Sequence, residues 1–261
     1  MILQPINTLF TGQNLIELPE AESTNDFAFE LLKSAAIPEG SAILTQKQTK
    51  GRGQREQSWE SESGKNITVS FIFYPRFLAA SRQFNLNICI SLGVLDFVNR
   101  VLHQGPVSIK WPNDVYFTNK KTGGILIENT IQGSYLQASV VGIGINLNQT
   151  EFRSDAPNPA SFKTITGKDY NIYECFGILC ECLEARYLQL KSGKEEELKK
   201  EYLKNLFQFD MYRDYLIKGN IYTCRITGVS DSGKLLLETR NREPEDLLAF
   251  EADLKEVKFI I

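Results

Sequence analysis

The sequence predicts an α+β fold, in which a mixed or antiparallel sheet is packed against helices, followed by a small all-β module. Short stretches rich in β-branched and aromatic residues, typical of strands, are separated by longer stretches in which apolar residues recur at helical spacing. The character of the chain changes after Tyr215, because only short strand-like stretches follow. We therefore expect a larger domain over residues 1–215 and a module of SH3-like size over residues 216–261.

The first half of the chain alternates between predicted strands and helices. Ser23 opens a Ser-Thr-Asn-Asp stretch that is typical of a helix N-terminus, so a helix is expected over residues 25–36. Residues 50–65 are rich in Gly, Ser, Arg and Glu, which predicts a long loop. Strands are expected at 41–46, 66–74, 107–111 and 115–117, and a helix with an apolar stripe at 81–103.

The second half is expected to begin with a hairpin and to end in short strands. The hairpin is formed by residues 123–131 and 135–147, and a loop with two prolines follows at 151–161. Residues 171–206 are predicted to form two helices that are broken near Ser192 and Gly193. The strands of the module are expected at 221–229, 235–239 and 257–261.

Composition and charge exclude several classes of protein. Of 261 residues, 42% are hydrophobic and 23% are charged, which is ordinary for a soluble globular protein. The net charge of −3 argues against broad electrostatic binding to nucleic acid, which usually needs a basic face. The N-terminus does not resemble a secretory signal, and no apolar run looks long enough to cross a bilayer, so we expect no membrane partner and a cytoplasmic location.

Cysteine and histidine usage points the same way. The cysteines are odd in number and lack paired zinc-ligand spacing, which favours reduced cytoplasmic thiols; they are Cys89, Cys175, Cys180, Cys182 and Cys224. His103 is the only histidine, so mechanisms that need several histidines are excluded.

A first candidate site motif is GRGQR, residues 51–55. Its glycines let the backbone approach a ligand closely, and its arginines offer forked donors for phosphate or carboxylate. A flexible surface loop with solvated charges is the alternative interpretation. The motif is not a phosphate-binding Walker loop, because no Gly-Lys-Ser/Thr follows at the required spacing.

A second motif is KWPND, residues 110–114, which places a cation, an aromatic ring and a carboxylate at the end of a strand. Lys110 could bind phosphate or carboxylate, and Asp114 could hold magnesium or orient a cation. The alternative is a strand end followed by an Asx turn, with Trp111 in the core.

Two glycine-containing segments follow. Residues 121–124, KTGG, suggest either close backbone approach to a ligand or a tight turn. Residues 141–148, VGIGINLN, alternate glycine with apolar residues, so that a strand here has one face without side chains at Gly142 and Gly144 and offers Asn146 on that face. A pair of bulges is the alternative, and the third glycine of a dinucleotide-binding loop is missing.

Together, these motifs resemble those of the biotin–protein ligase family in order and spacing. The matching segments are 22–25 (ESTN), 48–53 (QTKGRG), 58–59 (SW), 110–114, 121–128 and 142–146. The resemblance spans about residues 20–150, and the C-terminal module is similar to the SH3-like end of the family. It implies a class II synthetase-like catalytic domain followed by an SH3-like β-barrel, in a short form without the N-terminal DNA-binding domain of some relatives.

The resemblance implies an ATP-dependent ligase that acts in two steps. The carboxylate of biotin attacks the α-phosphate of ATP, giving biotinyl-5'-AMP and pyrophosphate, and a lysine of a biotin carboxyl carrier protein domain then attacks the mixed anhydride. Both reactants of the first step are anions, so cations and magnesium are expected to offset their charge. No protein nucleophile is needed, because the intermediate is a bound adenylate. The assembly is expected to be a monomer or a homodimer.

The family's functional residues map onto this sequence position by position. Biotin is expected to contact Ser23, Thr24, Asn25, Gln48, Gly51, Arg52, Gly124 and Gly142. The nucleotide is expected to contact Arg52, Arg55, Trp59, Lys110, Lys121 and Asn146. Lys121, Arg52, Lys110 and Asp114 are the expected catalytic residues, and Asp114 is also the candidate ligand for magnesium. Ser23 could instead cap a helix, or serve both purposes, and Trp59 could instead belong to the core.

The sequence departs from the family pattern at three places. Many members have arginine where this chain has Gln54 and glycine where it has Glu56, which puts in doubt how tightly the loop retains the adenylate. The family's C-terminal arginine that reaches the nucleotide has no clear counterpart, and Lys255 or Lys258 is the candidate substitute.

Three rival functions are weighed against the ligase. A biotin-sensing repressor is disfavoured because only 22 residues precede Ser23, too few for a three-helix DNA-binding module. A lipoate ligase or octanoyl transferase is disfavoured because its glycine-rich arginine motif and placed cysteine are not seen. A biotin-binding protein without activity differs from the ligase only if the cationic side chains that would offset the charge of the reactants take no part in a reaction.

Overall fold

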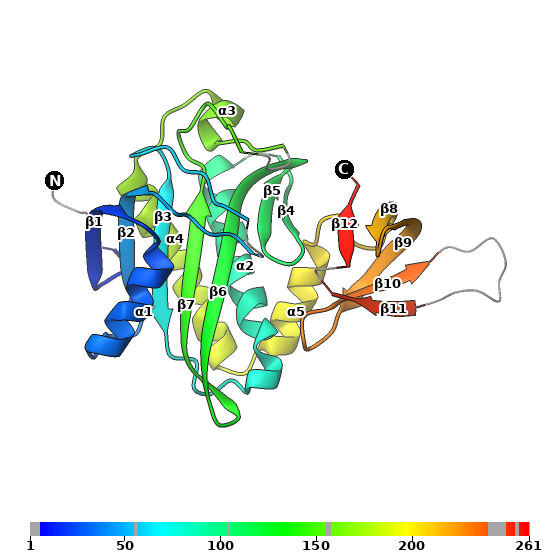
Figure 1. Cartoon of the computed structure of the whole chain (residues 1–261), viewed down its shortest axis with the longest axis horizontal. Helices are drawn as coiled ribbons and strands as arrows, with labels where there is room; N and C mark the ends of the chain where they lie inside the picture. Colours follow the sequence, from blue (N-terminus) through cyan, green and yellow to red (C-terminus); the bar gives the residue numbers. More distant parts are fainter. Residues whose placement is uncertain are drawn as a thin grey trace.

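The computed structural model contains two sheets, a large one at the N-terminal side and a smaller one at the C-terminal side (Figure 1). The structure describes residues 6–54, 57–103, 105–154, 158–239, 249–253 and 256–260. The predicted α+β class is confirmed, because helices cover a mixed sheet and an antiparallel sheet follows it.

The large sheet has seven strands in the order β1-β2-β3-β7-β6-β5-β4. Their bounds are β1 Leu15–Ala21, β2 Ser41–Gln48, β3 Ile67–Phe73, β4 Val107–Lys110, β5 Asp114–Phe117, β6 Lys120–Gln132 and β7 Tyr135–Ile145. Only the β1–β2 pair is parallel among these neighbours, and helix α1 (Thr24–Ser34) makes the crossover that a parallel pair requires. The sheet is therefore mixed, which is one of the two arrangements that the sequence predicts.

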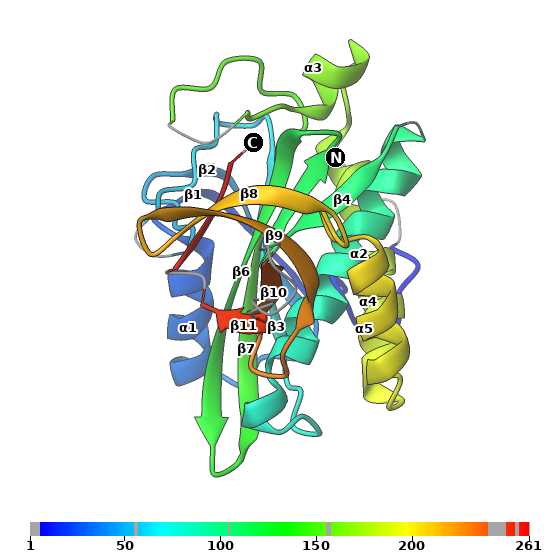
Figure 2. The same ribbon diagram turned by 90° about the vertical axis from the view of Figure 1, so that its right-hand side faces the viewer.

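Helices cover the two faces of this sheet unequally. Helices α2 (Phe84–Leu102) and α4 (Ile172–Lys191) pack on one face, with α5 (Glu195–Lys204) beside them, and this is where the main core lies. On the other face α1 packs over a small cluster that includes Ile43, Ile72 and Val140. Figure 2 shows the sheet edge-on between α1 and the group of α2, α4 and α5. Apart from α1, no helix in the described part of the chain packs over β6 and β7 on this face, which leaves room for a site.

The helix ends follow local sequence signals. The Oγ of Ser23 accepts a hydrogen bond from the Asp26 N–H (3.3 Å), so Ser23 caps α1 as expected. The break near Ser192 and Gly193 is confirmed, because α4 ends at Lys191 and α5 begins at Glu195. A short helix, α3 (Phe162–Thr166), and a 3₁₀ turn, η1 (Ala80–Arg82), complete the described helices.

Helix α2 contradicts the expectation that no apolar run could cross a bilayer. The stretch Ala80–Leu102 is long and apolar enough to cross a membrane by length and composition alone, so the statement that no run qualifies was wrong. In the folded chain α2 is the central helix of the core, and 67% of its most apolar window is buried. Burial between the sheet, α4 and α5 explains its apolar character without a membrane.

The smaller sheet has five antiparallel strands in the order β11-β10-β9-β8-β12. Their bounds are β8 Tyr212–Ile217, β9 Asn220–Val229, β10 Leu235–Thr239, β11 Ala249–Ala252 and β12 Val257–Phe259. The indole N–H of Trp111 donates to the carbonyl of Gly233 (3.0 Å), which ties the turn between β9 and β10 to the large sheet. The boundary at residue 215 stays a prediction, and β8 begins three residues before it.

Candidate functional site

The expected site residues gather in one cleft on the α1 face of the large sheet, with a volume of about 380 Å³. Its walls come from the start of α1, the loop after β2, the turn between β4 and β5, the strands β6 and β7, and β12 of the smaller sheet. Eleven of the expected residues line it: Ser23, Thr24, Asn25, Gln48, Arg52, Trp59, Lys110, Asp114, Lys121, Gly124 and Gly142. Segments far apart in the sequence therefore converge on one cavity.

One end of the cleft, formed by Ser23, Thr24, Asn25 and Gln48, is neutral and polar, and we call it the polar end. The side-chain carbonyl of Gln48 accepts the backbone N–H of Thr24 at 2.9 Å and lies 3.3 Å from its hydroxyl. Ser23, Thr24 and Asn25 are all at most 4% exposed. Buried donors and acceptors that face a cavity suit a neutral ligand with its own hydrogen-bonding groups.

The floor of the cleft is bare because its strands carry glycines. A Cβ at Gly142 would lie 2.5 Å from the Asn25 Oδ1, and a Cβ at Gly144 would lie 2.3 Å from the Trp59 ring. A Cβ at Gly124 would meet the same ring at 3.1 Å. The predicted face without side chains is therefore real, and it receives the Asn25 amide and the Trp59 indole.

The other end, formed by Lys110, Asp114 and Lys121, is charged, and we call it the cationic end. The Lys121 ammonium lies 2.7 Å from an Asp114 carboxylate oxygen, and both side chains are largely buried, at 15% and 23% exposure. Lys121 also lies 5.7 Å from the centre of the Trp59 ring. An indole surface thus adjoins the pair of charges.

Lys110 occupies an aromatic environment at this end. Its ammonium lies 5.2 Å from the centre of the Tyr116 ring and 5.1 Å from that of Phe259. Burial lowers the pKa of Lys110, although the charge of nearby Asp114 opposes this effect. Among the described residues Lys110 has no ion-pair partner, so an anionic ligand would stabilise its charged form.

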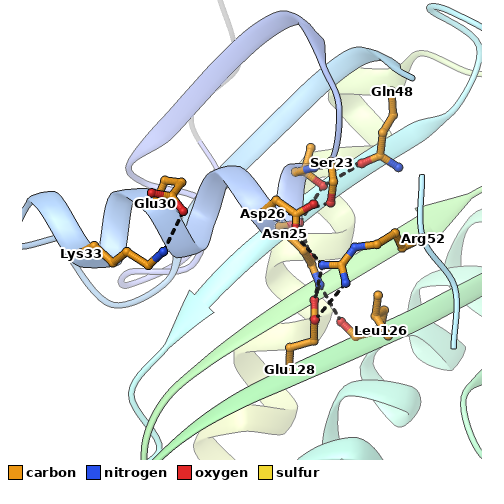
Figure 3. A network of polar contacts seen from close by, with 11 residues as sticks. Ser23, Asn25, Asp26, Glu30, Lys33, Gln48, Arg52, Leu126 and Glu128 are labelled. Atoms are coloured by element: carbon orange, nitrogen blue, oxygen red, sulfur yellow. Dashed lines mark hydrogen bonds and ion pairs between the residues drawn. The ribbon is translucent and has the colours of Figure 1, made fainter. Parts of the chain in front are cut away.

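Arg52 lies at the rim, in a loop that crosses the α1 face of β6 and β7. The loop is held by an isolated bridge between Arg52 and Ser58 and by the Trp59 N–H, which donates to the Gly51 carbonyl (2.9 Å). The Arg52 guanidinium donates to the carboxylates of Asp26 (2.6 Å) and Glu128 (2.9 and 3.2 Å), as Figure 3 shows. Arg52 is thus paired with one carboxylate from helix α1 and one from strand β6 of the large sheet.

Comparison with known proteins identifies the family. A sequence model of the Biotin/lipoate A/B protein ligase family matches residues 18–146. The chain is 29% identical to the bifunctional ligase/repressor BirA of Bacillus spizizenii over 246 residues, which cover 90% of this chain and 72% of the relative. A solved structure of the biotin protein ligase from Aquifex aeolicus, in complex with biotin and ATP, matches with a TM-score of 0.72 and 27% identity, and covers 95% of each chain.

The chain belongs to the biotin protein ligase family. Within the family it is also 38% identical over 136 residues to the biotin–[acetyl-CoA-carboxylase] ligase of Paracoccus denitrificans, over 50% of this chain and 53% of the relative. The family that the motifs predict is therefore confirmed, and so is the prediction that the chain is an enzyme of this family.

Three expected residues of the ligase do not line the cleft or cannot be placed. A Cβ at Gly51 would lie 2.4 Å from the Trp59 carbonyl oxygen, so this glycine lets two segments of the loop cross closely. Asn146 is buried and does not line the cleft, and its amide N–H donates to the Ala160 carbonyl (3.2 Å). Arg55, with Glu56, lies outside the described residues. The ligand contacts assigned to these three stay predictions.

Several contacts in and around the cleft of the ligase were not predicted from the sequence. Asp26 and Glu128 were not predicted as partners of Arg52, although both lie in segments that were singled out. Val257, Lys258 and Phe259 of β12 reach the cleft from the smaller sheet. Lys258 is thus placed at the cleft, while Lys255 lies outside the described residues.

The cysteines of the ligase have no role in this cleft. All five are buried, and burial raises the pKa of Cys182 to about 11 and that of Cys175 to about 12. Thiols with such pKa values are poor nucleophiles at neutral pH. Within the described ranges there is also no group of three or more histidine, cysteine or acidic side chains that could enclose a metal ion.

Proposed function

We propose that this ligase activates biotin with ATP to form biotinyl-5'-AMP and then transfers biotin to a lysine of a biotin carboxyl carrier protein domain. The observation that carries the proposal is the two-ended cleft, in which buried neutral groups face a cluster of cations. Biotin has the same division, since its ureido ring is neutral and its valerate chain ends in a carboxylate.

The polar end suits the ureido ring. The ring offers two N–H donors and one carbonyl acceptor, and the hydroxyls of Ser23 and Thr24 can both donate and accept. The amide of Gln48 supplies a further donor and acceptor beside them. The bare strand at Gly142 leaves space for the fused rings, because a side chain there would occupy the floor.

The cationic end suits the first reaction. A biotin carboxylate oxygen attacks the α-phosphorus of ATP, an acyl–phosphate bond forms, and the bond to the β-phosphate breaks as pyrophosphate leaves with the electron pair. Lys110 and Lys121 would offset the repulsion between the two anions and the charge that gathers on the phosphate oxygens. The Trp59 indole would provide a stacking surface for the adenine base.

The second reaction needs access rather than a protein nucleophile. The neutral amine of the carrier lysine attacks the acyl carbon and an amide bond forms. AMP leaves with the electron pair of the broken bond, and the nitrogen gives up one proton to water. Asp114, beside Lys121, is a carboxylate at the cationic end that can orient the amine. Biotin–[acetyl-CoA-carboxylase] ligase activity in the Paracoccus relative supports a carboxylase carrier domain as the acceptor.

Magnesium fits this cleft as a companion of the nucleotide. Magnesium in nucleotide sites takes most ligands from phosphates and water, with one or two protein carboxylates. Asp114 is the carboxylate at the cationic end that would hold the ion, whose charge would then assist Lys110 and Lys121 in offsetting that of the phosphates.

The test is exchange of labelled pyrophosphate into ATP, followed by transfer of biotin to a carrier domain. We expect exchange that requires biotin and labelling of one carrier lysine. Exchange that proceeds equally without biotin, or with lipoate in its place, would exclude the proposed activity. Exchange without transfer to any carrier domain would limit the function to adenylate formation.

A further inference from the structure

Glu128 connects the polar end of the cleft to Arg52. Its carboxylate accepts the Asn25 amide N–H at 2.7 Å and two N–H groups of Arg52 at 2.9 and 3.2 Å (Figure 3). Glu128 belongs to β6, Asn25 to α1 and Arg52 to the loop after β2, so one carboxylate joins three elements. The sequence motifs alone indicate no role for Glu128.

The Asn25 side chain is fixed from all sides. It is 3% exposed, and its Oδ1 accepts the Ser70 hydroxyl at 2.6 Å. The same hydroxyl lies 2.7 Å from the Thr24 Oγ1, so two acceptors compete for its single proton. The absence of a side chain at Gly142 provides the space for the amide. A ligand that bonds to Thr24 would leave the Ser70 proton to Asn25, which holds the Asn25 N–H toward Glu128.

Arg52 can be held by these carboxylates and still bind an anion. A guanidinium has five N–H donors, and the contacts to Asp26 and Glu128 use three of them. The remaining two donors have no partner among the described residues and can meet a carboxylate or phosphate at the rim. Since the Arg52 side chain is 42% exposed, its ion pairs are screened by solvent and serve to orient it more than to stabilise the fold.

We propose that Glu128 is a positioning residue that couples occupancy of the polar end to the orientation of Arg52. Biotin at the polar end fixes Asn25, Asn25 holds Glu128, and Glu128 turns the guanidinium toward the incoming triphosphate. Asp26, from the same helix as Asn25, supports Arg52 on its other side. The inference rests on the proposed function, because it requires that biotin binds before or with ATP in this cleft.

The experiment measures how biotin changes nucleotide affinity in the full-length protein. An ATP analogue with a methylene group between the α- and β-phosphates is titrated by calorimetry with and without biotin. In the wild type we expect biotin to tighten binding of the analogue by about tenfold, and in Glu128→Gln by less than about twofold. Biotin affinity without nucleotide should change little, because glutamine can still accept the Asn25 N–H.

A double-variant cycle separates positioning from general damage. If Glu128 acts through Arg52, then Glu128→Gln adds no further loss of coupling or of exchange rate in an Arg52→Gln background. Glu128→Asp, which keeps the charge, should recover part of the coupling. The matched control is Glu30→Gln, since Glu30 forms an exposed pair with Lys33 on the same helix α1, away from the cleft (Figure 3).

Several outcomes would overturn the inference. One is that biotin tightens analogue binding in Glu128→Gln as much as in the wild type. Another is that Glu128→Gln causes a further loss of coupling or exchange rate when it is added to Arg52→Gln. If Glu128→Gln unfolds, Asp26→Asn replaces it, because Asp26 is 59% exposed, and undiminished coupling there would equally contradict the inference. A wild type without biotin-dependent exchange would instead refute the proposed function, whereas normal exchange with no such coupling refutes only the role of Glu128.

Discussion

The indole ring of Trp59 lies against Gly144, at a point where even a methyl group would overlap it. A Cβ at Gly144 would lie 2.3 Å from the ring, and the Trp59 N–H is buried without a hydrogen-bond partner among the described residues. Gly144 of β7 therefore provides the space in which the Trp59 indole, from a distant loop, can lie. The position of this ring within the cleft depends on the absence of a side chain at Gly144.

Gly144→Ala is expected to displace Trp59 without unfolding the protein. The added methyl group must push the ring aside, so the KM for ATP in pyrophosphate exchange should rise by about tenfold, the amount that one stacked base is worth. Tryptophan emission should shift at the same time. Gly177→Ala in α4 is the control, because a Cβ there meets nothing within 4 Å, and an unchanged KM for ATP in Gly144→Ala would contradict the role of the ring.

The alternation of glycine and apolar residues in 141–148 predicted much of this floor. A strand places alternate residues on one face, so the bare face at Gly142 and Gly144 followed from spacing alone. What lies on that face could not be predicted, since Trp59 and Asn25 come from segments more than 80 residues away. The same limit explains Glu128, which is 76 residues from Arg52 and carries no local pattern that indicates a partner.

Strand β1 was not among the strands predicted from the sequence, and its local composition explains why. β1 contains Pro19 and two glutamates among its seven residues, a composition that disfavours a strand. It lies at the edge of the sheet, beside β2 alone, where a residue without an N–H is tolerated. Its parallel pairing with β2 depends on α1, so tertiary structure outweighs local preference.

Lys110 is expected to give the protein a measurable pH dependence. Burial lowers the pKa of Lys110, so the folded state binds this proton less tightly than the unfolded state does. At low pH the buried charge of Lys110 reduces the free energy of unfolding by its full amount. This reduction becomes smaller as pH rises through the lowered pKa toward about 10.4, the ordinary lysine value. The free energy of unfolding of the wild type, minus that of Lys110→Met, should therefore increase with pH.

Urea unfolding of both proteins between about pH 7 and about pH 10 tests this sign, because the comparison cancels the other lysines. Biotin-dependent exchange should lose activity on the alkaline side as Lys110 becomes neutral. A difference between the two proteins that stays constant or falls with pH would show that folding does not lower the pKa of Lys110.

Glu184 is expected to hold the N-terminal segment on the main core. Its carboxylate is 6% exposed and accepts the backbone N–H groups of Leu9, Phe10 and Thr11 at 2.6 to 2.9 Å. Glu184→Gln replaces one acceptor by an N–H₂ group that faces these donors, so unfolding should become easier by about 2 kcal/mol. Glu181→Gln on the same helix, which breaks only the partly exposed pair with Arg100, should cost less than about 1 kcal/mol in the same urea titration.

Lys121→Ala is expected to separate chemistry from binding. The Lys121 ammonium is held 2.7 Å from the Asp114 carboxylate, at the opposite end of the cleft from Thr24 and Gln48. Its charge matters most where negative charge gathers during attack on the α-phosphate, so the rate of adenylate formation should fall by about 100-fold. Biotin affinity, which depends mainly on the polar end, should weaken by less than about tenfold.

The two quantities are measured by single-turnover formation of biotinyl-5'-AMP and by titration calorimetry with biotin. Asp114→Asn is the companion variant, because it leaves the Lys121 charge in place and removes its partner. If Lys121 only balanced the charge of Asp114, then adding Asp114→Asn to Lys121→Ala would restore the lost activity. Because we assign Lys121 to the reacting anions, the double variant should stay as slow as Lys121→Ala, and equal losses of rate and biotin affinity would remove that assignment.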